Sequence, residues 1–495
     1  MKFRKIAAVL LGLSFLLTGC GRNGYDINDD HEINDSVSEE LASESLFTQP
    51  AAPEAAMTEP ATIITGTAAA ATTTEEITAS AQPESSSDHS GNDNSDHRQE
   101  QTQQSYSESD HESYQPTEAA PSDVHTTKRT TAVTTTRRIT TTTTTCKPTP
   151  STVLEKMTLK QKVCQMFMVT PEAITGISPM LEVGNGTRKA MADYPVGGII
   201  YFSQNLSSKN QIKTMISSTQ GFSREACSVG LFIGVDEEGG KVARCADKLG
   251  TTAFKPMEYY GKENNYKTAY DIGAALGKDL GSLGFNVDFA PVADVNINSG
   301  NELGDRIFSS DPNVVANMVC GVSKGLQDNG ISATLKHFPG LGAESGNTHT
   351  NSTVIIDRTV EELRKTEFVP FKKGIDSGTD FVMVGHMSVS GFGDDLPCDL
   401  SYKAVTEMLR GELGFNGIAI TDAHQMQTIS NVYSSGEAAK LSIKAGIDII
   451  LMPVDYRAAV DEVCKAVESG EIPESRIDES VMRILEKKDR LGLLK

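Results

Sequence analysis

Eight short apolar segments, spread over residues 165–452, constrain the fold of this chain more than any other feature of its sequence. Each segment is too short for a typical buried helix and has the length of a buried β-strand. We therefore predict eight strands. They cover residues 165–169, 198–202, 231–235, 287–292, 332–335, 381–384, 418–421 and 447–452.

Amphipathic stretches separate these segments and predict helices. The clearest are residues 269–283, 314–329, 360–377 and 436–445, and the chain ends with a helical stretch at 479–491. A strand followed by a helix, repeated eight times, is typical of a closed (β/α)8 barrel, an α/β fold of the TIM type. Residues 151–495 have a suitable length for one such domain. A doubly wound open sheet is the alternative.

Polar side chains follow five of the predicted strands directly. They are Asp236 and Glu237, Asp294, Lys336 and His337, His386, and Asp422. In a parallel barrel the carboxyl ends of all strands meet at one rim, and the catalytic groups lie there. We therefore expect these side chains to surround a single site.

The first third of the chain has a different composition. Residues 21–150 are rich in Ser, Thr, Ala, Glu, Asp, Gln and Pro, and residues 126–145 are nearly all Thr with a few basic residues. Such a segment has too few apolar side chains to offset the entropy lost on folding. We predict a disordered Ser/Thr-rich tether over 21–150.

Residues 1–20 have the pattern of a signal peptide. Basic residues at positions 2, 4 and 5 precede the apolar run 6–17, which is too short for a stable membrane span. The run ends in Leu17-Thr18-Gly19-Cys20 and resembles the lipobox of bacterial lipoproteins, in which the cysteine is acylated. An ordinary cleaved signal is the alternative. We expect an extracytoplasmic protein, lipid-anchored through Cys20 to the outer face of the cell membrane.

Charge and composition exclude some partners. The net charge of −21 disfavours nucleic acid, which requires clustered Lys and Arg. Seven cysteines follow Cys20 without any Cys-x-x-Cys pair, so we expect no metal site and no cofactor. The chain contains no Trp, so Phe, Tyr or Met would have to pack against a sugar ring if one binds. We expect a monomer.

Four motifs resemble glycoside hydrolase family 3, most closely the NagZ-like β-N-acetylhexosaminidase branch. They are residues 234–244 (GVDEEGGKVAR), 286–295 (NVDFAPVADV), 336–340 (KHFPG) and 420–426 (ITDAHQM). The resemblance covers residues 151–495 and implies a barrel enzyme that cleaves terminal β-linked N-acetylglucosamine with retention of configuration. The substrate would be a carbohydrate such as a cell-wall fragment, a chitooligosaccharide or a glycan.

The resemblance also implies roles for individual residues. Asp422 would be the nucleophile that forms a glycosyl-enzyme, although an Asp at this position could instead cap the next helix. The residues implied to bind the sugar are Asp236, Arg244, Arg306, Lys336 and His337. For the two arginines a structural ion pair is the alternative. His386 either lines the pocket or is a buried, hydrogen-bonded histidine, and we favour the second.

The acid/base implied by the resemblance is His349, in Gly346-Asn347-Thr348-His349-Thr350. A histidine that titrates near neutral pH can donate and take back a proton. The family pattern has Asp two residues before this histidine, whereas this chain has Asn347. The loop also has Leu341 and Ala343 where the family has His and Asp. These departures leave open that His349 is only a solvated loop residue.

Three other functions stay open on the sequence alone. A family 3 β-glucosidase or β-xylosidase would usually take its acid from a second domain after the barrel, and we expect no such domain here, since the predicted barrel domain extends to residue 495. The altered loop around Asn347 favours a non-catalytic sugar-binding lipoprotein, but Asp422 argues against it. A phosphorylase is the third alternative, because a neutral acid/base admits anionic phosphate more easily than a carboxylate does.

The anchor can be tested by replacing its cysteine. Cys20→Ser should move the protein from the membrane fraction into a soluble or unprocessed form, because a serine at this position cannot receive the thioether-linked lipid. Fractionation and intact mass measure this. Wild-type protein recovered entirely in the medium, without an acyl mass, would contradict the prediction.

Overall fold

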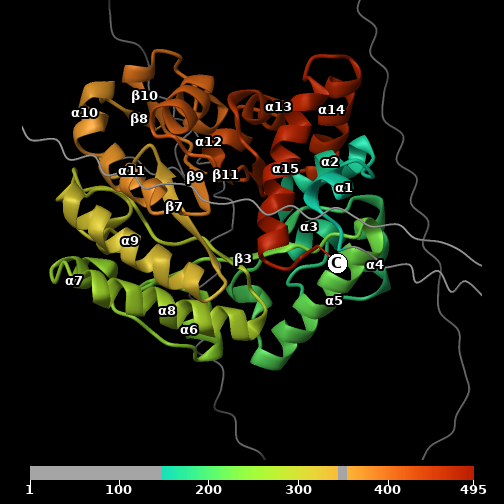
Figure 1. The fold of residues 1–495 in the computed structure, drawn as a ribbon, viewed down its shortest axis with the longest axis horizontal. Helices are drawn as coiled ribbons and strands as arrows, with labels where there is room; N and C mark the ends of the chain where they lie inside the picture. Colours follow the sequence, from blue (N-terminus) through green and yellow to red (C-terminus); the bar gives the residue numbers. More distant parts are fainter. Residues whose placement is uncertain (1–146, 344–353, 495) are drawn as a thin grey trace, which may run out of the picture. The chain divides into compact units, whose positions relative to one another are not determined.

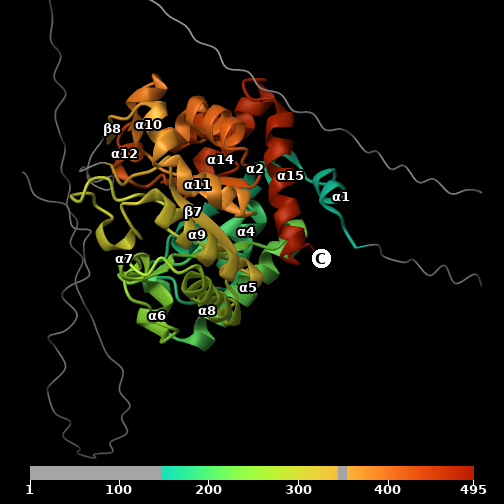
Figure 2. The same ribbon diagram turned by 60° about the vertical axis from the view of Figure 1, so that its left-hand side comes forward.

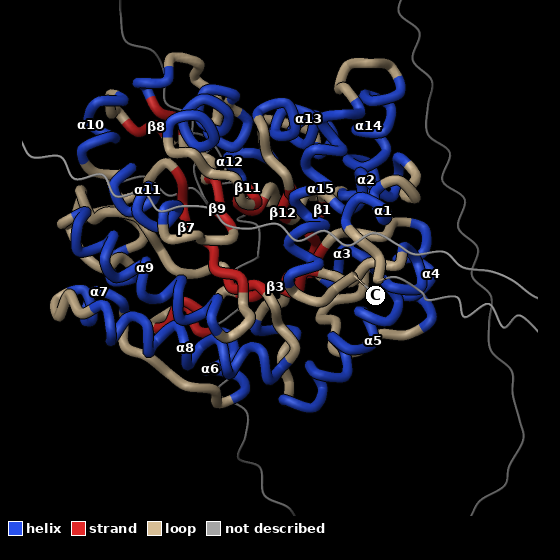
Figure 3. The backbone as a smooth tube through the Cα atoms, in the orientation of Figure 1, coloured by secondary structure: helices blue, strands red, loops and turns tan. Residues whose placement is uncertain are grey.

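The computed structural model describes residues 147–343 and 354–494, and Cys20, Asn347 and His349 lie outside these ranges. Eight parallel strands form a closed barrel in the order β1-β12-β11-β9-β7-β6-β3-β2. Figure 3 shows them at the centre of a ring of helices. Their bounds are β1 Phe167–Val169, β2 Gly198–Ile200, β3 Phe232–Val235, β6 Val287–Asp288, β7 Ser332–Phe338, β9 Phe381–Val384, β11 Ile418–Ala423 and β12 Ile449–Leu451.

All eight predicted strands are present, and closure of the barrel rules out the open sheet. β1 closes it by pairing with β12 on one side, where Phe167 is opposite Ile450, and with β2 on the other, where Met168 is opposite Gly198. β6 is shorter than predicted. β7 is longer and contains Lys336 and His337 within the strand.

Helices surround the barrel (Figure 1). The α-helices are α1 Pro150–Leu154, α2 Leu159–Gln165, α3 Pro171–Thr175, α4 Asn185–Asp193, α5 Lys209–Cys227, α6 Arg244–Leu249, α7 Met257–Gly261, α8 Tyr266–Leu283, α9 Pro312–Asp328, α10 Val360–Lys365, α11 Phe368–Asp376, α12 Gln427–Ser430, α13 Ser435–Ala445, α14 Tyr456–Glu468 and α15 Glu474–Arg490. Short 3-10 turns are η1 Ser203–Asn205, η2 Gly304–Arg306, η3 Ser390–Phe392 and η4 Cys398–Leu400, and η5 Lys403–Glu412 is a π-helix. None of the helices in the described part of the chain has the length and apolar character needed to cross a membrane.

The predicted helix over 360–377 is wrong as one helix, because it divides into α10 and α11. Thr366 leaves the helical conformation, with φ −129° and ψ −80°. Its neighbour Glu367 is buried and accepts a hydrogen bond from Arg358 Nε at 3.0 Å. This ion pair links the junction between α10 and α11 to the chain just before α10.

Two small two-stranded elements were not predicted. β4 Glu237–Gly239 pairs with β5 Val242–Ala243 in an antiparallel hairpin, and β8 Ile355–Ile356 pairs with β10 Ser388–Val389. The hairpin turns at Gly239 and Gly240, whose φ angles of +90° and +60° suit glycine. It returns the chain to the barrel rim just before Arg244.

Two glycines in the barrel strands leave space for the side chain of Met168. A Cβ at Gly234 would lie 2.6 Å from Met168 Cε and 2.9 Å from a ring carbon of Phe289. At Gly198 it would lie 3.0 Å from Met168 Sδ. Met168 therefore occupies space that these two glycines leave open, and larger residues at either position would displace it.

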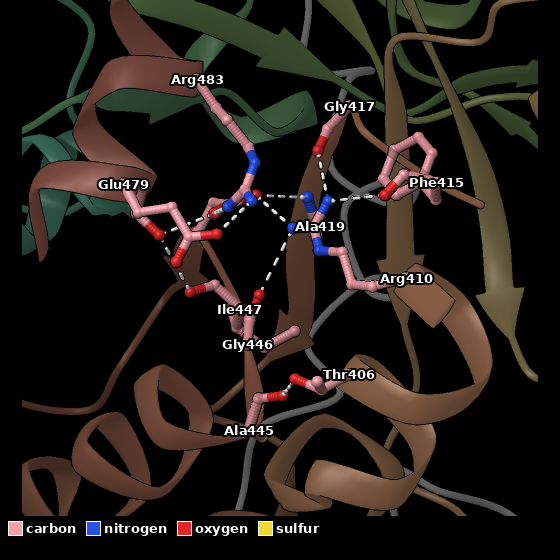
Figure 4. A network of polar contacts seen from close by, with 12 residues as sticks. Thr406, Arg410, Phe415, Gly417, Ala419, Ala445, Gly446, Ile447, Glu479 and Arg483 are labelled. Carbon is pink, nitrogen blue, oxygen red and sulfur yellow. Dashed lines mark hydrogen bonds and ion pairs between the residues drawn. The ribbon is translucent and has the colours of Figure 1, made fainter. Parts of the chain in front are cut away.

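At the amino-terminal ends of the strands, buried ions attach the last helix to the barrel. Asp448, just before β12, is fully buried and accepts hydrogen bonds from Arg410 of η5 at 2.5 Å and Arg483 of α15 at 3.0 Å. Arg476 of α15 lies 4.0 Å away. Figure 4 shows Arg410 and Arg483 converging on this region, with Arg410 also donating to the carbonyl of Gly417 at 2.7 Å. Asp448 thus joins two helices to β11 and β12.

α15 also brings the two ends of the described domain together. Its Lys488 is buried at this end of the barrel and donates to Gln165 Oε1 at 2.7 Å and to the Gly197 carbonyl at 2.8 Å. α1 lies beside α15 (Figures 1 and 2), and Lys147 forms an ion pair with Asp489 at 2.7 Å. The described chain therefore begins and ends on the side of the barrel opposite the carboxyl ends of the strands.

The Asp448 network predicts a large effect on stability. Asp448→Ala should lower the free energy of unfolding by about 3–5 kcal/mol, because it leaves buried arginines without their counter-ion. Urea denaturation followed by circular dichroism measures this. The control is Asp376→Ala on α11, which removes a half-exposed partner of Lys372 and should cost about 1 kcal/mol or less. Equal midpoints for the two variants would contradict the prediction.

Candidate active site

A cavity of about 360 Å³ opens at the carboxyl ends of the barrel strands. Residues at the ends of β2, β3, β6, β7, β9, β11 and β12 line it. They include Ile200, Phe202, Asp236, Glu238, Arg244, Phe289, Glu302, Arg306, Lys336, His337, Leu341, Met383, Asp422, Met426 and Met452. Six of the seven residues that the resemblance assigns to catalysis or sugar binding therefore lie in one cavity. The seventh, His349, is outside the described residues.

Lys336 lies at the centre of a chain of ion pairs on the cavity wall. Its Nζ contacts Asp236 Oδ1 at 2.8 Å and Glu238 Oε1 at 2.6 Å. Arg306 completes the chain by binding Glu238 with two hydrogen bonds, both 2.8 Å long. Two cations thus hold two carboxylates in fixed positions, as recognition of adjacent sugar hydroxyls requires.

These ion pairs keep the groups charged. Burial by itself raises the pKa of Glu238, but Lys336 and Arg306 outweigh it and lower that pKa to about 2. Burial tends to lower the pKa of Lys336, but Asp236 and Glu238 raise it above its ordinary value. Each shift favours the charged form, so Glu238 and Lys336 stay ionised from mildly acidic to mildly basic pH.

Asp422 lies near the end of β11 and faces the cavity. Burial tends to raise its pKa, but His386, His337 and Lys336 together lower it below the ordinary value. The side chain accepts a hydrogen bond from the Ala423 amide at 2.7 Å. It does not cap the next helix, since α12 begins after Met426 without a side-chain cap. Asp422 is an ionised carboxylate in the cavity, which is the state a nucleophile needs.

His337 is oriented by a buried carboxylate. Its Nδ1 lies 2.8 Å from Asp294 Oδ2, and the same oxygen accepts the His337 amide at 3.1 Å. The other oxygen of Asp294 accepts the Leu341 amide at 2.6 Å. Asp294 therefore fixes the imidazole ring and leaves Nε2 as the nitrogen that can serve the cavity.

The two arginines differ in their surroundings. Arg306 fits both roles considered for it, since it forms an ion pair with Glu238 and also lines the cavity where a sugar would bind. Arg244 is the first residue of α6, and its guanidinium lies 5.9 Å from the ring centre of Phe202. Glu237 holds the start of α6 by accepting the amides of Cys245 at 2.6 Å and Ala246 at 2.9 Å.

Sequence reasoning missed Glu238, although the signal was present. In an extended strand, alternate residues point to the same side. Asp236 and Glu238 both reach Lys336, while Glu237 between them is buried against α6. Burial raises the pKa of Glu237 to about 7, consistent with its structural role. The alternation in this motif would have identified the second carboxylate.

The apolar part of the cavity contains the residue types expected in a chain without Trp. Phe202 and Phe289 line it together with Met383, Met426 and Met452. Their side chains offer a surface of aromatic and thioether groups to the apolar face of a ligand.

His386 is not among the lining residues. It is buried and binds the Ala423 carbonyl through Nε2 at 3.0 Å.

Comparisons with known proteins agree with this geometry. Beta-hexosaminidase A of Pseudoalteromonas piscicida is 30% identical over 345 residues, which are 64% of this chain and 56% of that protein. Beta-hexosaminidase LpqI of Mycobacterium tuberculosis is 31% identical over 59% of this chain and 76% of its own length. A structure of a glycoside hydrolase family 3 beta-N-acetylglucosaminidase from a Paenibacillus strain has 36% identity and a TM-score of 0.64, with 68% of this chain and 63% of that chain covered. This chain thus spans less than two thirds of two of these three relatives.

The profile of the glycosyl hydrolase family 3 N-terminal domain matches residues 158–487. This range contains the whole barrel and every described residue of the cavity. On the fold, the cavity and this match, the chain belongs to glycosyl hydrolase family 3.

Proposed function

We propose that this protein is a retaining β-N-acetylhexosaminidase that hydrolyses terminal β-linked N-acetylglucosamine. The observation that carries the proposal is Asp422, a carboxylate kept ionised in a cavity whose polar wall is built by Lys336, Asp236 and Glu238. Three relatives named hexosaminidase or N-acetylglucosaminidase, at 30–36% identity, support the choice of sugar.

The proposed reaction has two displacements. Asp422 attacks the anomeric carbon as the bond to the leaving oxygen breaks, and that oxygen takes a proton from the acid/base. Water then attacks the same carbon, gives a proton back to the acid/base and releases Asp422 as a carboxylate. Lys336, Asp236 and His337 would hold the hydroxyl groups so that the anomeric carbon lies in line with Asp422.

We propose His349 as the acid/base and Cys20 as the lipid anchor. His349 follows Asn347 on the segment after β7, whose carboxyl end lies at the cavity. Leu17-Thr18-Gly19-Cys20 after a basic and apolar leader supports a lipoprotein on the outer face of the cell membrane. The carbohydrate substrate would then be met outside the cytoplasm.

The nucleophile is tested with an aryl β-N-acetylglucosaminide. Asp422→Ala should lose several orders of magnitude in kcat and largely keep ligand binding, because the alanine cannot form the glycosyl-enzyme. A fluorinated sugar inhibitor should label Asp422, and proton NMR should detect the β-anomer first. Initial release of the α-anomer would contradict the two-step mechanism. Absence of any cleavage by the wild type would favour a sugar-binding protein, and faster turnover with added phosphate would favour a phosphorylase.

The acid/base is tested by comparing leaving groups. His349→Ala should slow natural disaccharides more than activated aryl glycosides, because a good leaving group needs little protonation. Asn347→Asp should increase kcat/KM mainly for disaccharides and move the alkaline limb of the pH profile upward, since a carboxylate stabilises the imidazolium. If His349→Ala leaves both substrate classes unchanged, the proton comes from another group.

A further inference from the structure

A second cluster of titratable side chains lies behind the cavity. His386, Asp399 and His424 are buried, with 1%, 0% and 2% of their surface exposed, and none of them lines the cavity. They come from three places: the end of β9, the turn η4, and the segment just after Asp422. The reaction proposed above gives these groups no role.

Asp399 joins the two histidines. Its Oδ2 lies 2.9 Å from His424 Nε2, and its Oδ1 lies 3.1 Å from His386 Nδ1. The other nitrogen of His386, Nε2, lies 3.0 Å from the carbonyl oxygen of Ala423, the residue after the nucleophile. The cluster therefore reaches the backbone that carries Asp422.

The groups beside its two ring nitrogens favour a charged His386. A carbonyl oxygen can only accept a hydrogen bond, and an ionised carboxylate can only accept as well. Nε2 of His386 therefore carries a proton for the Ala423 carbonyl. Nδ1 makes an ion-pair contact of 3.1 Å with Asp399 Oδ1 that is not aligned as a hydrogen bond. An unprotonated Nδ1 would turn its lone pair toward that carboxylate, so the contact favours a second proton and an imidazolium. His424 needs only the proton on Nε2, since its Nδ1 has no partner within the described structure.

The electrostatic balance points the same way. Burial favours the neutral form of His386, but Asp399, Asp422 and the Ala423 carbonyl raise its pKa to about 9. Burial raises the pKa of Asp399, but His386 and His424 lower it to about 2. Burial lowers the pKa of His424, which stays neutral.

We infer that Asp399 is a positioning residue for the nucleophile: it holds His386 as an imidazolium against the Asp422–Ala423 backbone, and this charge keeps Asp422 a carboxylate. The inference rests on the proposed role of Asp422. A buried carboxylate without a nearby cation takes up a proton at higher pH, and the protonated acid cannot attack the anomeric carbon. The same cation favours departure of Asp422 as an anion in the second displacement.

Several other charged groups face these residues, and any pH effect includes them. Lys336 and His337 of β7 also favour the ionised form of Asp422. His424 and Asp422 face His386 from the β11 segment, and Tyr433 lies near Asp399. Asp399 is the one carboxylate in this cluster that contacts both histidines, so removing its charge should remove the imidazolium.

The test is Asp399→Asn, assayed with an aryl β-N-acetylglucosaminide across pH. The amide has nearly the same shape but supplies no charge, so His386 should become neutral and the pKa of Asp422 should rise. The acid limb of kcat/KM should move to higher pH by about one unit or more, because activity is lost once Asp422 is protonated. Asp394→Asn, on the same segment and half-buried, is the matched control and should leave the acid limb in place.

Histidine side-chain 15N NMR gives a readout that needs no substrate and reports on the wild-type protein itself. In the wild-type protein at pH 7.5, one ring, assigned by its loss in His386→Gln, should carry protons on both nitrogens. A neutral His386 in the wild type, or an unchanged acid limb in Asp399→Asn, would overturn the inference. If the wild type cleaves no glycoside at all, the proposed function fails while the NMR experiment still decides the state of His386.

Discussion

Hydrogen bonding of β1 on both of its edges is the constraint on which the rest of this structure depends. A parallel sheet of eight strands closes only when the first and last strands pair, as β1 and β12 do here. Closure places every carboxyl end at one rim. Asp236 and Lys336 are 100 positions apart along the chain, and Lys336 and Asp422 are 86 positions apart. Closure of the barrel is the reason that all three meet in one cavity.

The barrel and much of the site could be predicted from the sequence because they depend on local patterns. An apolar run predicts a strand, and an Asp, Lys or His that follows the run is predicted to lie at the rim of the barrel. The junction at Thr366 could not be predicted in this way, since the ion pair between Arg358 and Glu367 that accompanies it is a tertiary contact. The same holds for Asp399, whose role depends on meeting His386 and His424, residues that only the folded chain brings to it.

Two groups of buried charged side chains in this barrel pair cations with carboxylates. Lys336 and Arg306 face Asp236 and Glu238 at the cavity, while three arginines surround Asp448 at the opposite end. An isolated ion in either place would carry a large desolvation cost. Lys488 is different, since neutral oxygens are its hydrogen-bond partners in the described structure, and burial lowers its pKa to about 7. Buried side chains with counter-ions, such as Glu238, Lys336 and Asp448, therefore have pKa values shifted toward the charged form. The pKa of Lys488, which lacks such a partner in the described structure, is shifted toward the neutral form.

The contact between Lys147 and Asp489 has a consequence for how this domain can be rearranged or attached to other molecules. Because the two ends meet, a peptide of a few residues could join them, and new termini could be opened in an exposed loop, giving a circular permutant with the barrel intact. A reporter or a solid support coupled near Lys147 or Asp489 would lie on the side of the barrel opposite the cavity, and the cavity would face the solution.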